Sequence, residues 1–204
     1  LLLFLQPARF EGKTIRQLVA DSEHDFDAIY ILINIGPPAV EPLIRILEDR
    51  ESTFEEAYRR IWPSLPKALQ AKFPNPLFNG PMDKRNVYHI LTSIGEPKEL
   101  ILPVIRSAST NSESEIRFAA VSSLRNLSPT NAPLVIPILT NALVDSRSNV
   151  RGAAASVLGA FGGEAGEAAA VLAMAMSDDD ADVRMHVARA LRNLGVASLT
   201  VTNA

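Results

Sequence analysis

The 204-residue sequence has no cysteine, few aromatic residues and little net charge. Without a thiol, the chain can form neither a disulfide framework nor a thiolate metal site or nucleophile. This absence fits the cytoplasm and is also compatible with an oxidising compartment. The net charge of −3 offers no general attraction for a polyanion such as nucleic acid. No apolar run approaches the roughly 20 residues that span a bilayer.

Hydrophobic residues nevertheless make up 47% of the chain, and only 6% of all residues are aromatic. This hydrophobic share is ample for a core in a chain that is long enough for one domain or two small ones. A core rich in Ala, Leu, Ile and Val suits closely packed helices better than a β-sandwich. The composition therefore favours a helical protein.

A sequence unit that occurs twice near the C-terminus indicates how such helices are arranged. Residues 149–162 and 182–195 both carry a Val-Arg pair near the start and end in Leu-x-x-Leu/Phe-Gly. Their offset is 195 − 162 = 33 residues, and similar boundaries occur at 95 and 128. A period between about 20 and 50 residues is typical of stacked repeats, in which each unit buries its apolar face against a neighbour.

Helical spacing is also visible in the first quarter of the chain. The pattern predicts a short helix at 15–20 with Thr14 as its N-cap, and helices at 25–35 and 39–49 separated by Gly36-Pro37-Pro38. Residues 52–86 interrupt the period with several prolines. We interpret Trp62 in this segment as a plug over the seam between repeats, with a ligand platform as the alternative.

These patterns together predict an all-α fold, a right-handed α-α superhelix of about five helical hairpins. We expect one solenoid domain over residues 1–204. Its expected parts are an atypical N-terminal repeat at 1–52, an insertion at 53–86, regular repeats at 87–195 and a tail at 196–204.

Charged residues recur at fixed places in the repeats. Asp145 and Asp178 stand five positions before the valine of a Val-Arg pair. An arginine at each level, near an aspartate that follows the preceding helix, can form charge-assisted hydrogen bonds between repeats. We therefore expect a structural ladder, with a phosphate-binding track along its arginines as the alternative. Its members are Arg117, Asp145, Arg151, Asp178 and Arg184.

The pairs Ile116-Arg117, Val150-Arg151 and Val183-Arg184, within units that mostly end in glycine, resemble HEAT repeats. The closest resemblance is to the short, Ala-rich bacterial kind that also occurs in phycobilin lyases. It covers residues 87–195 and, less closely, residues 24–49. The resemblance implies an α-solenoid, and it raises a lyase-like handling of tetrapyrroles as one alternative function.

Patterns that carry catalysis or bind metals are missing from the sequence. Residues 178–182 are acidic but lack the glycine and distal glutamate of a calcium loop, so we interpret them as helix capping. The glycines of 159–166 are not followed by Gly-Lys-Ser/Thr. His24, His89 and His186 form no HExxH pair and no catalytic triad order. We therefore expect no enzyme, no cofactor and no metal.

The remaining candidate is a surface stripe on the second helix of each hairpin. Stacked repeats commonly bind an extended segment or a helix of another protein on their concave wall. The residues in the middle of the stripe, at Gly152 and Gly159, are small, and those at its C-terminal end are basic. This pattern favours an acidic or amphipathic peptide over nucleic acid as the partner. The alternative is a solvated face without function. We expect the partner-binding residues to be Phe118, Ser122, Arg125, Ser156, Met185, Arg189 and Arg192.

The N-terminal residues Leu1 to Leu5 bear on where the protein is found. They fit the remnant of a signal segment or membrane anchor, which would place the protein in the periplasm or outside the cell. The alternative is an apolar strip beneath the first helices of a cytoplasmic protein. A structural module within a larger envelope protein is a further alternative function.

Overall fold

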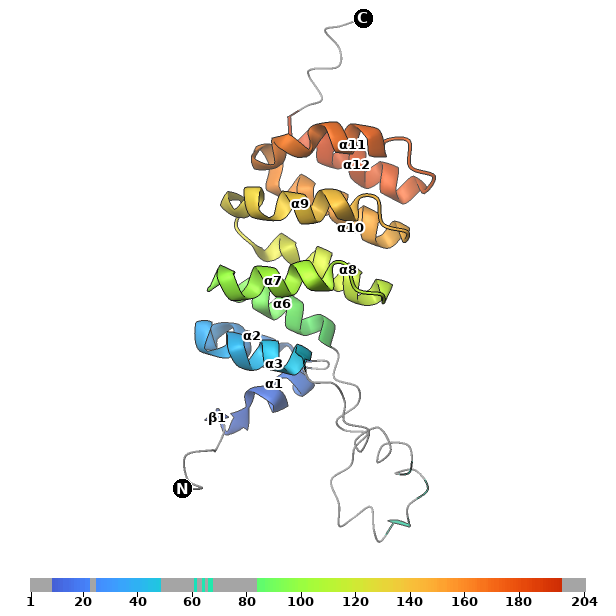
Figure 1. Cartoon of the computed structure of the whole chain (residues 1–204). Coiled ribbons are helices and arrows are strands. Elements are labelled where there is room, and N and C mark those ends of the chain that lie inside the picture. Colours follow the sequence, from blue (N-terminus) through green and yellow to red (C-terminus); the bar gives the residue numbers. More distant parts are fainter. Residues whose placement is uncertain are drawn as a thin grey trace, which may run out of the picture.

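The structure is a computed structural model that describes residues 9–22, 25–48, 61, 64, 66, 67 and 84–195. Over these residues the chain is a column of stacked helices (Figure 1). The strands among these residues are β1 (Arg9–Phe10) and β2 (Lys13–Thr14), which form a short antiparallel hairpin. The all-α superhelix predicted from the repeat is therefore confirmed. Leu1 to Leu5, Trp62 and the tail lie outside the described residues.

The described helices pack as five pairs along the chain, and every pair contacts the next. The pairs are α1 (Ile15–Asp21) with α2 (Phe26–Ile35), α3 (Val40–Glu48) with α6 (Lys84–Ile94), α7 (Lys98–Ala108) with α8 (Ser114–Ser123), α9 (Ala132–Ala142) with α10 (Ser148–Phe161), and α11 (Ala169–Ala175) with α12 (Ala181–Asn193). Short 3-10 turns link them at η2 (Pro37–Ala39), η4 (Leu124–Asn126), η5 (Pro129–Asn131) and η6 (Gly162–Ala168).

The pairs form two layers. The second helices α2, α6, α8, α10 and α12 contact one another in that order, and we call them the second-helix layer. The first helices α3, α7, α9 and α11 form the other layer (Figure 1). The apolar core runs between the layers for the length of the column. Its fully buried side chains include Leu18, Leu32, Leu43, Leu91, Ile105, Leu139, Leu158 and Leu172.

The turn inside each pair has nearly constant length near the C-terminus. Five residues separate the two helices in each of the last three pairs, at 109–113, 143–147 and 176–180. The same turn between α3 and α6 is replaced by residues 49–83. The irregular segment predicted from the prolines thus falls between two helices that pack against each other.

Local sequence explains where several helices begin and end. Thr14 is the N-cap of α1, as predicted, because its hydroxyl accepts a hydrogen bond from the Gln17 amide and the Gln17 side chain accepts one from the Thr14 amide. Gly36 and Gly162 follow α2 and α10 with φ angles of 70° and 57°. This left-handed region suits glycine, so the chain can leave each helix there and enter the next pair.

One helical stretch, Ser148–Ala175, is long and apolar enough to cross a membrane by length and composition, with a mean hydropathy of 1.3. The stretch from Phe26 to Glu48 qualifies only if its two halves, bent by 105°, count as one span. The first stretch departs from the sequence expectation that no run approaches such a length. It comprises α10 and α11, which lie in different layers and are interrupted at Gly162, so we interpret it as core helices of the column.

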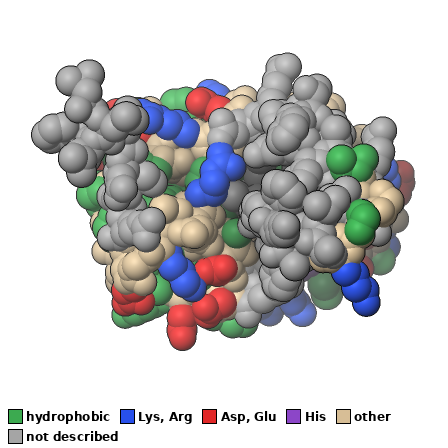
Figure 2. All heavy atoms as spheres, turned by 90° about the horizontal axis from the view of Figure 1, so that it is seen from below, with side chains coloured by type: hydrophobic (Ala, Val, Ile, Leu, Met, Phe, Trp, Pro, Cys, Tyr) green, Lys and Arg blue, Asp and Glu red, His purple; other side chains and the backbone are tan. Residues whose placement is uncertain are grey.

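Charges are mixed at the end of the column where the described chain begins. Figure 2 shows this end, and its described basic and acidic side chains are interspersed with apolar ones. Lys13 and Asp21 form one ion pair here, with Nζ and Oδ2 2.7 Å apart. The described residues of this face therefore carry charges of both signs.

Candidate partner-binding groove

The second helices α6, α8, α10 and α12 all run in the same direction. Their N-terminal ends lie on one edge of the layer, and their C-terminal ends lie on the other. Bonds between successive pairs at both edges show this alignment: Arg151 contacts Asp178 at the first edge, and Asn193 contacts Gly159 at the second. Equivalent side chains therefore recur in rows across the layer.

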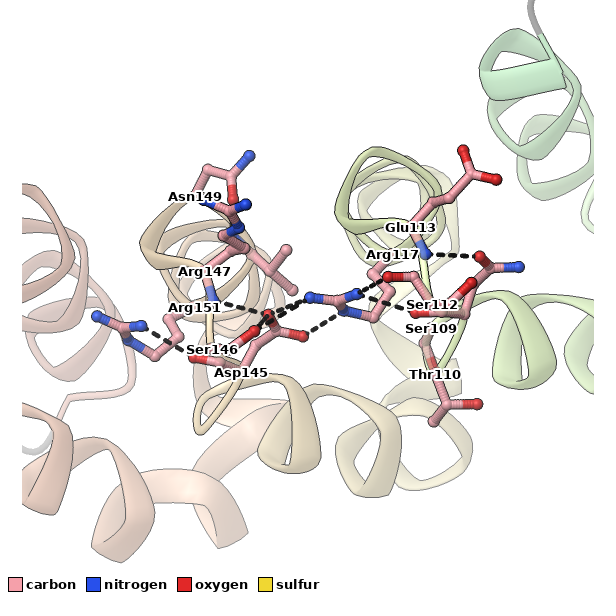
Figure 3. Close-up of polar contacts among 12 residues, drawn as sticks. Ser109, Thr110, Ser112, Glu113, Arg117, Asp145, Ser146, Arg147, Asn149 and Arg151 are labelled. Carbon is pink, nitrogen blue, oxygen red and sulfur yellow. Dashed lines mark hydrogen bonds and ion pairs between the residues drawn. The ribbon is translucent and has the colours of Figure 1, made fainter.

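The N-terminal edge carries the arginine–aspartate ladder. Arg117 binds Asp145 of the next pair at two points, with Nε–Oδ2 at 2.6 Å and Nη2–Oδ1 at 2.8 Å (Figure 3). Arg151 binds Asp178 in the same way, at 2.7 Å for both contacts. The four side chains are between 9% and 17% exposed, so water screens these ion pairs little. Each arginine holds the pKa of its aspartate below the ordinary value.

Backbone carbonyl groups hold the same arginines from the other side. Nη1 of Arg117 donates to the carbonyl oxygens of Asn111 and Ser112 at 2.9 and 3.1 Å. Nη1 of Arg184 donates to those of Asp178 and Asp179, but no carboxylate of the described residues binds it at two points. Two of the three guanidinium groups are thus committed to joining repeats, which favours the ladder over a phosphate track.

Asparagines at the opposite edge also join successive repeats, and the sequence patterns considered above did not predict them. Nδ2 of Asn193 donates to the carbonyl oxygen of Gly159 at 3.2 Å, and Nδ2 of Asn126 donates to that of His89 at 3.1 Å. Both bonds reach carbonyl groups of the preceding second helix, and that of Gly159 is among the last four of α10, which lack a partner within the helix. The available signal was the tetrapeptide Leu-Arg-Asn-Leu, which occurs at 124–127 and again at 191–194.

A groove lies between these two edges, on the outer surface of α8, α10 and α12. It has a larger section with a volume of about 420 Å³ and a smaller section with a volume of about 180 Å³. The two sections share Arg125, Ser156 and His186, so they form one continuous hollow. Of the stripe predicted from the sequence, the groove brings together Phe118, Ser122, Arg125, Ser156 and Arg189. Met185 and Arg192 are exposed on α12 beside it.

Side-chain size explains why the groove exists. A Cβ at Gly159 would stand 2.9 Å from the Cα of Ala190, so the glycine lets α10 and α12 come very close. At the equivalent positions 34 residues earlier, Phe118 of α8 and Arg125 of η4 replace Gly152 and Gly159. These large side chains lie along the groove and not beneath a neighbouring helix.

The same contacts correct one sequence expectation. Gly152 and Gly159 were expected on the face away from the core, but both are buried where α12 packs against α10. Each still lines one section of the groove, Gly152 the larger and Gly159 the smaller. The accessible surface between them is supplied by Ser156, which is partly exposed.

The charges of the groove differ between its two ends. Asp180 and Asp182 line it at the N-terminal edge of α12, and Arg125 and Arg189 line it toward the C-terminal edge. The Ser148 hydroxyl and then the Val183 amide lower the pKa of Asp180, which is the N-cap of α12. Phe118, 36% exposed, adds an apolar surface. The lining therefore combines an acidic end, a basic end and an aromatic side chain.

The two described histidines, His89 and His186, lie on different helices. His186 lines the groove, and His89 is partly buried in α6, where desolvation lowers its pKa. His24 lies outside the described residues. Within the portion of the chain that the structure describes, no three His, Cys, Asp or Glu side chains are grouped so that they could hold a metal ion.

Comparison with known proteins agrees with this architecture. Residues 102–192 match a family model described as HEAT repeats. Residues 102–192 are thus HEAT repeats, and they contain the ladder and all of the groove lining except Asn193. No curated protein sequence matches it.

Solved structures that match this chain include the following two. One is the complex of CpcE and CpcF of phycocyanin lyase from Nostoc sp. PCC7120, with 22% identity, a TM-score of 0.51, and coverage of 96% of this chain and 70% of that one. The other is a crystal structure of an engineered protein, with 19% identity, a TM-score of 0.45, and coverage of 91% and 80%. At such identities the likeness concerns the fold alone.

Proposed function

We propose that this protein is a non-enzymatic scaffold that binds a segment of another protein in the groove of the second-helix layer. The observation that carries the proposal is the continuous hollow across α8, α10 and α12, which Phe118 and Arg125 line at positions where the next repeat has glycines. Helical repeat proteins use such extended surfaces to bind peptides and helices.

The lining supports a protein segment more than nucleic acid. A polyanion would meet Asp180 and Asp182 at one end of the groove, and the whole chain carries a charge of −3. An amphipathic segment, by contrast, can place an apolar side chain on Phe118 and an acidic one near Arg189. The exposed Met185, at 41%, extends the apolar surface beyond the groove.

The test is a pair of double variants that change charge equally at different places. Arg189→Glu with Arg192→Glu reverses the basic end of the surface. Arg45→Glu with Arg106→Glu makes the same change on the exposed faces of α3 and α7, in the other layer. A partner captured by the unchanged protein is identified, purified and titrated against all three proteins.

We expect the first double variant to bind the purified partner at least about tenfold more weakly, because charge reversal places repulsion against an acidic segment. The control should bind like the unchanged protein. Equal affinity for all three proteins, or an equal loss in the control, would remove the groove as the binding site.

Tetrapyrrole handling is the second candidate, because one structure of similar fold is a phycocyanin lyase complex. The groove offers Arg125 and Arg189 for the propionate groups of such a molecule, and aspartates for its pyrrole nitrogens. Mixing the protein with a bilin should then shift the absorption band, and Asp180→Asn should reduce the shift. An unchanged spectrum at saturating protein would reject this candidate.

A further inference from the structure

Two arginines at the C-terminal end of the groove differ from the arginines of the ladder. Arg117 and Arg151 bind aspartates, and Arg85 has a glutamate 3.8 Å away. Neither Arg125 nor Arg189 has a carboxylate within 4 Å among the described residues. Two cations without a counter-charge lie here in a protein of negative net charge.

These two arginines converge on the smaller section of the groove. That section is lined by Arg125, Ser156, Gly159, Ala160, His186, Arg189, Ala190 and Asn193, and the lining includes no aspartate or glutamate. Its volume of about 180 Å³ is many times the roughly 10–15 Å³ that one water molecule needs. A carboxylate or a phosphate group therefore fits.

The walls of this hollow are fixed by hydrogen bonds and close packing. Nη2 of Arg125 donates a hydrogen bond to Oγ of Ser156, which holds the guanidinium group over α10. Asn193 ties the end of α12 to Gly159, and the close approach of Gly159 to Ala190 sets the floor. The cavity thus has a rigid base and one guanidinium group held in place.

We infer that this hollow is an oxyanion-binding subsite, which takes a carboxylate or phosphate group carried by the segment that the groove binds. The inference rests on the proposed function, because it assigns the anchor point of that segment. Planar guanidinium groups bind such oxyanions at two points, and the Ser156 hydroxyl supplies a further donor. Asp180 and Asp182, at the far end, repel the same group and so select one placement.

The experiment needs no partner, because small anions are sufficient probes. The full chain, labelled with ¹⁵N, is titrated with inorganic phosphate, acetate or chloride at constant ionic strength. The Nε–Hε signals of Arg125 and Arg189 are assigned with Arg125→Lys and Arg189→Lys. Arg106, exposed on α7, is the internal control.

We expect phosphate or acetate to shift the Arg125 and Arg189 signals along one saturable curve and to leave Arg106 unchanged. The anion with the lower dissociation constant identifies the group, phosphate or carboxylate, that the subsite prefers. Chloride should produce no saturable shift. Linear shifts shared by Arg106 would show only general screening and would overturn the subsite.

The result separates the subsite from the broader proposal. If anions bind saturably but no partner is found whose binding depends on the groove, the subsite is retained and the scaffold function is rejected. A partner whose binding falls on Phe118→Ser but not on Arg125→Gln with Arg189→Gln would retain the groove and reject the subsite.

Discussion

Arg151 of α10 and Asp178, which precedes α12, form an ion pair with two parallel contacts of 2.7 Å each. Oδ1 of Asp178 also accepts the Asp180 amide at 2.9 Å, so one carboxylate both joins two repeats and shapes the turn before α12. The side chain of Asp178 is 9% exposed. This geometry makes Asp178 a structural residue whose removal has a measurable effect on stability.

We predict that Asp178→Asn lowers the free energy of unfolding by about 2 kcal/mol, because it removes the charge from two charge-assisted hydrogen bonds. The asparagine oxygen can still accept the Asp180 amide, so the turn is kept. Urea unfolding measures the change. Asp179→Asn is the matched control, because Asp179 is exposed and should change stability by less than about 0.5 kcal/mol. Equal effects of the two changes would contradict a specific ladder.

The ladder also predicts how stability depends on pH. The arginines lower the folded-state pKa values of Asp145 and Asp178 below the value of about 3.9 typical of an unfolded chain. At low pH the unfolded chain therefore binds more protons than the folded one. The stabilisation is complete above that unfolded value and is lost as the pH falls through the lower folded values.

Urea unfolding measured at several pH values from 7 to about 2 should show this loss. The double variant Asp145→Asn with Asp178→Asn should be less stable at neutral pH and should lose less stability on acidification. Parallel curves for the two proteins below about pH 4 would show that other carboxylates cause the acid sensitivity.

The close approach of α10 and α12 predicts a steric effect at Gly159. Alanine there would place its Cβ 2.9 Å from the Cα of Ala190, a backbone atom that cannot move alone. We expect Gly159→Ala to destabilise the protein by about 1–3 kcal/mol through overpacking. A calorimetric thermal scan measures this, and a melting temperature equal to that of the unchanged protein would contradict the close packing.

Gly163→Ala provides the control for that change. Nothing lies within 4 Å of a Cβ at Gly163, and its φ is not in the left-handed region. We expect it to leave the melting temperature unchanged or to raise it slightly, because alanine restricts the unfolded chain. A similar loss in both variants would point to a backbone effect common to glycine replacements.

The arginines at the basic end of the groove should contribute little to the stability of the fold. Arg189 and Arg192 are exposed on α12 and form no ion pair with the described residues. Arg189→Glu with Arg192→Glu should therefore change the free energy of unfolding by no more than about 0.5 kcal/mol. Circular dichroism during thermal unfolding checks this. A large loss would mean that weaker binding by this variant reports unfolding.

The period of the sequence was sufficient to predict the stacked helices, because each repeat must bury the same apolar face. Val183, Val187 and Ala190 are all buried in α12, as their helical spacing predicted. The Thr14 cap was predictable for a similar reason, since its signal is local. These features depend on residues close together in the chain or on a regular offset.

Other features depend on which helix approaches which, and spacing alone does not determine that. Gly152 and Gly159 occupy the stripe expected to face outward, yet α12 covers them. Because glycine has no side chain, its residue type does not indicate whether the position is exposed or covered by a neighbouring helix. The groove depends on the same packing of neighbouring helices, because Phe118 of α8 and Arg125 of η4 occupy the corresponding positions and line it.

The pairing of α3 with α6 has a wider consequence for how this molecule can change. The two helices are connected by 83 − 48 = 35 residues, whereas five residues connect the two helices of each of the last three pairs. For a flexible chain, closing a connection of that length costs only about 1.7 kcal/mol more than closing one of five residues, since the entropy of closure grows with the logarithm of length. The edge that carries these turns can thus accept foreign sequence of many lengths, and a protein built this way can acquire new recognition elements without redesigning its interior.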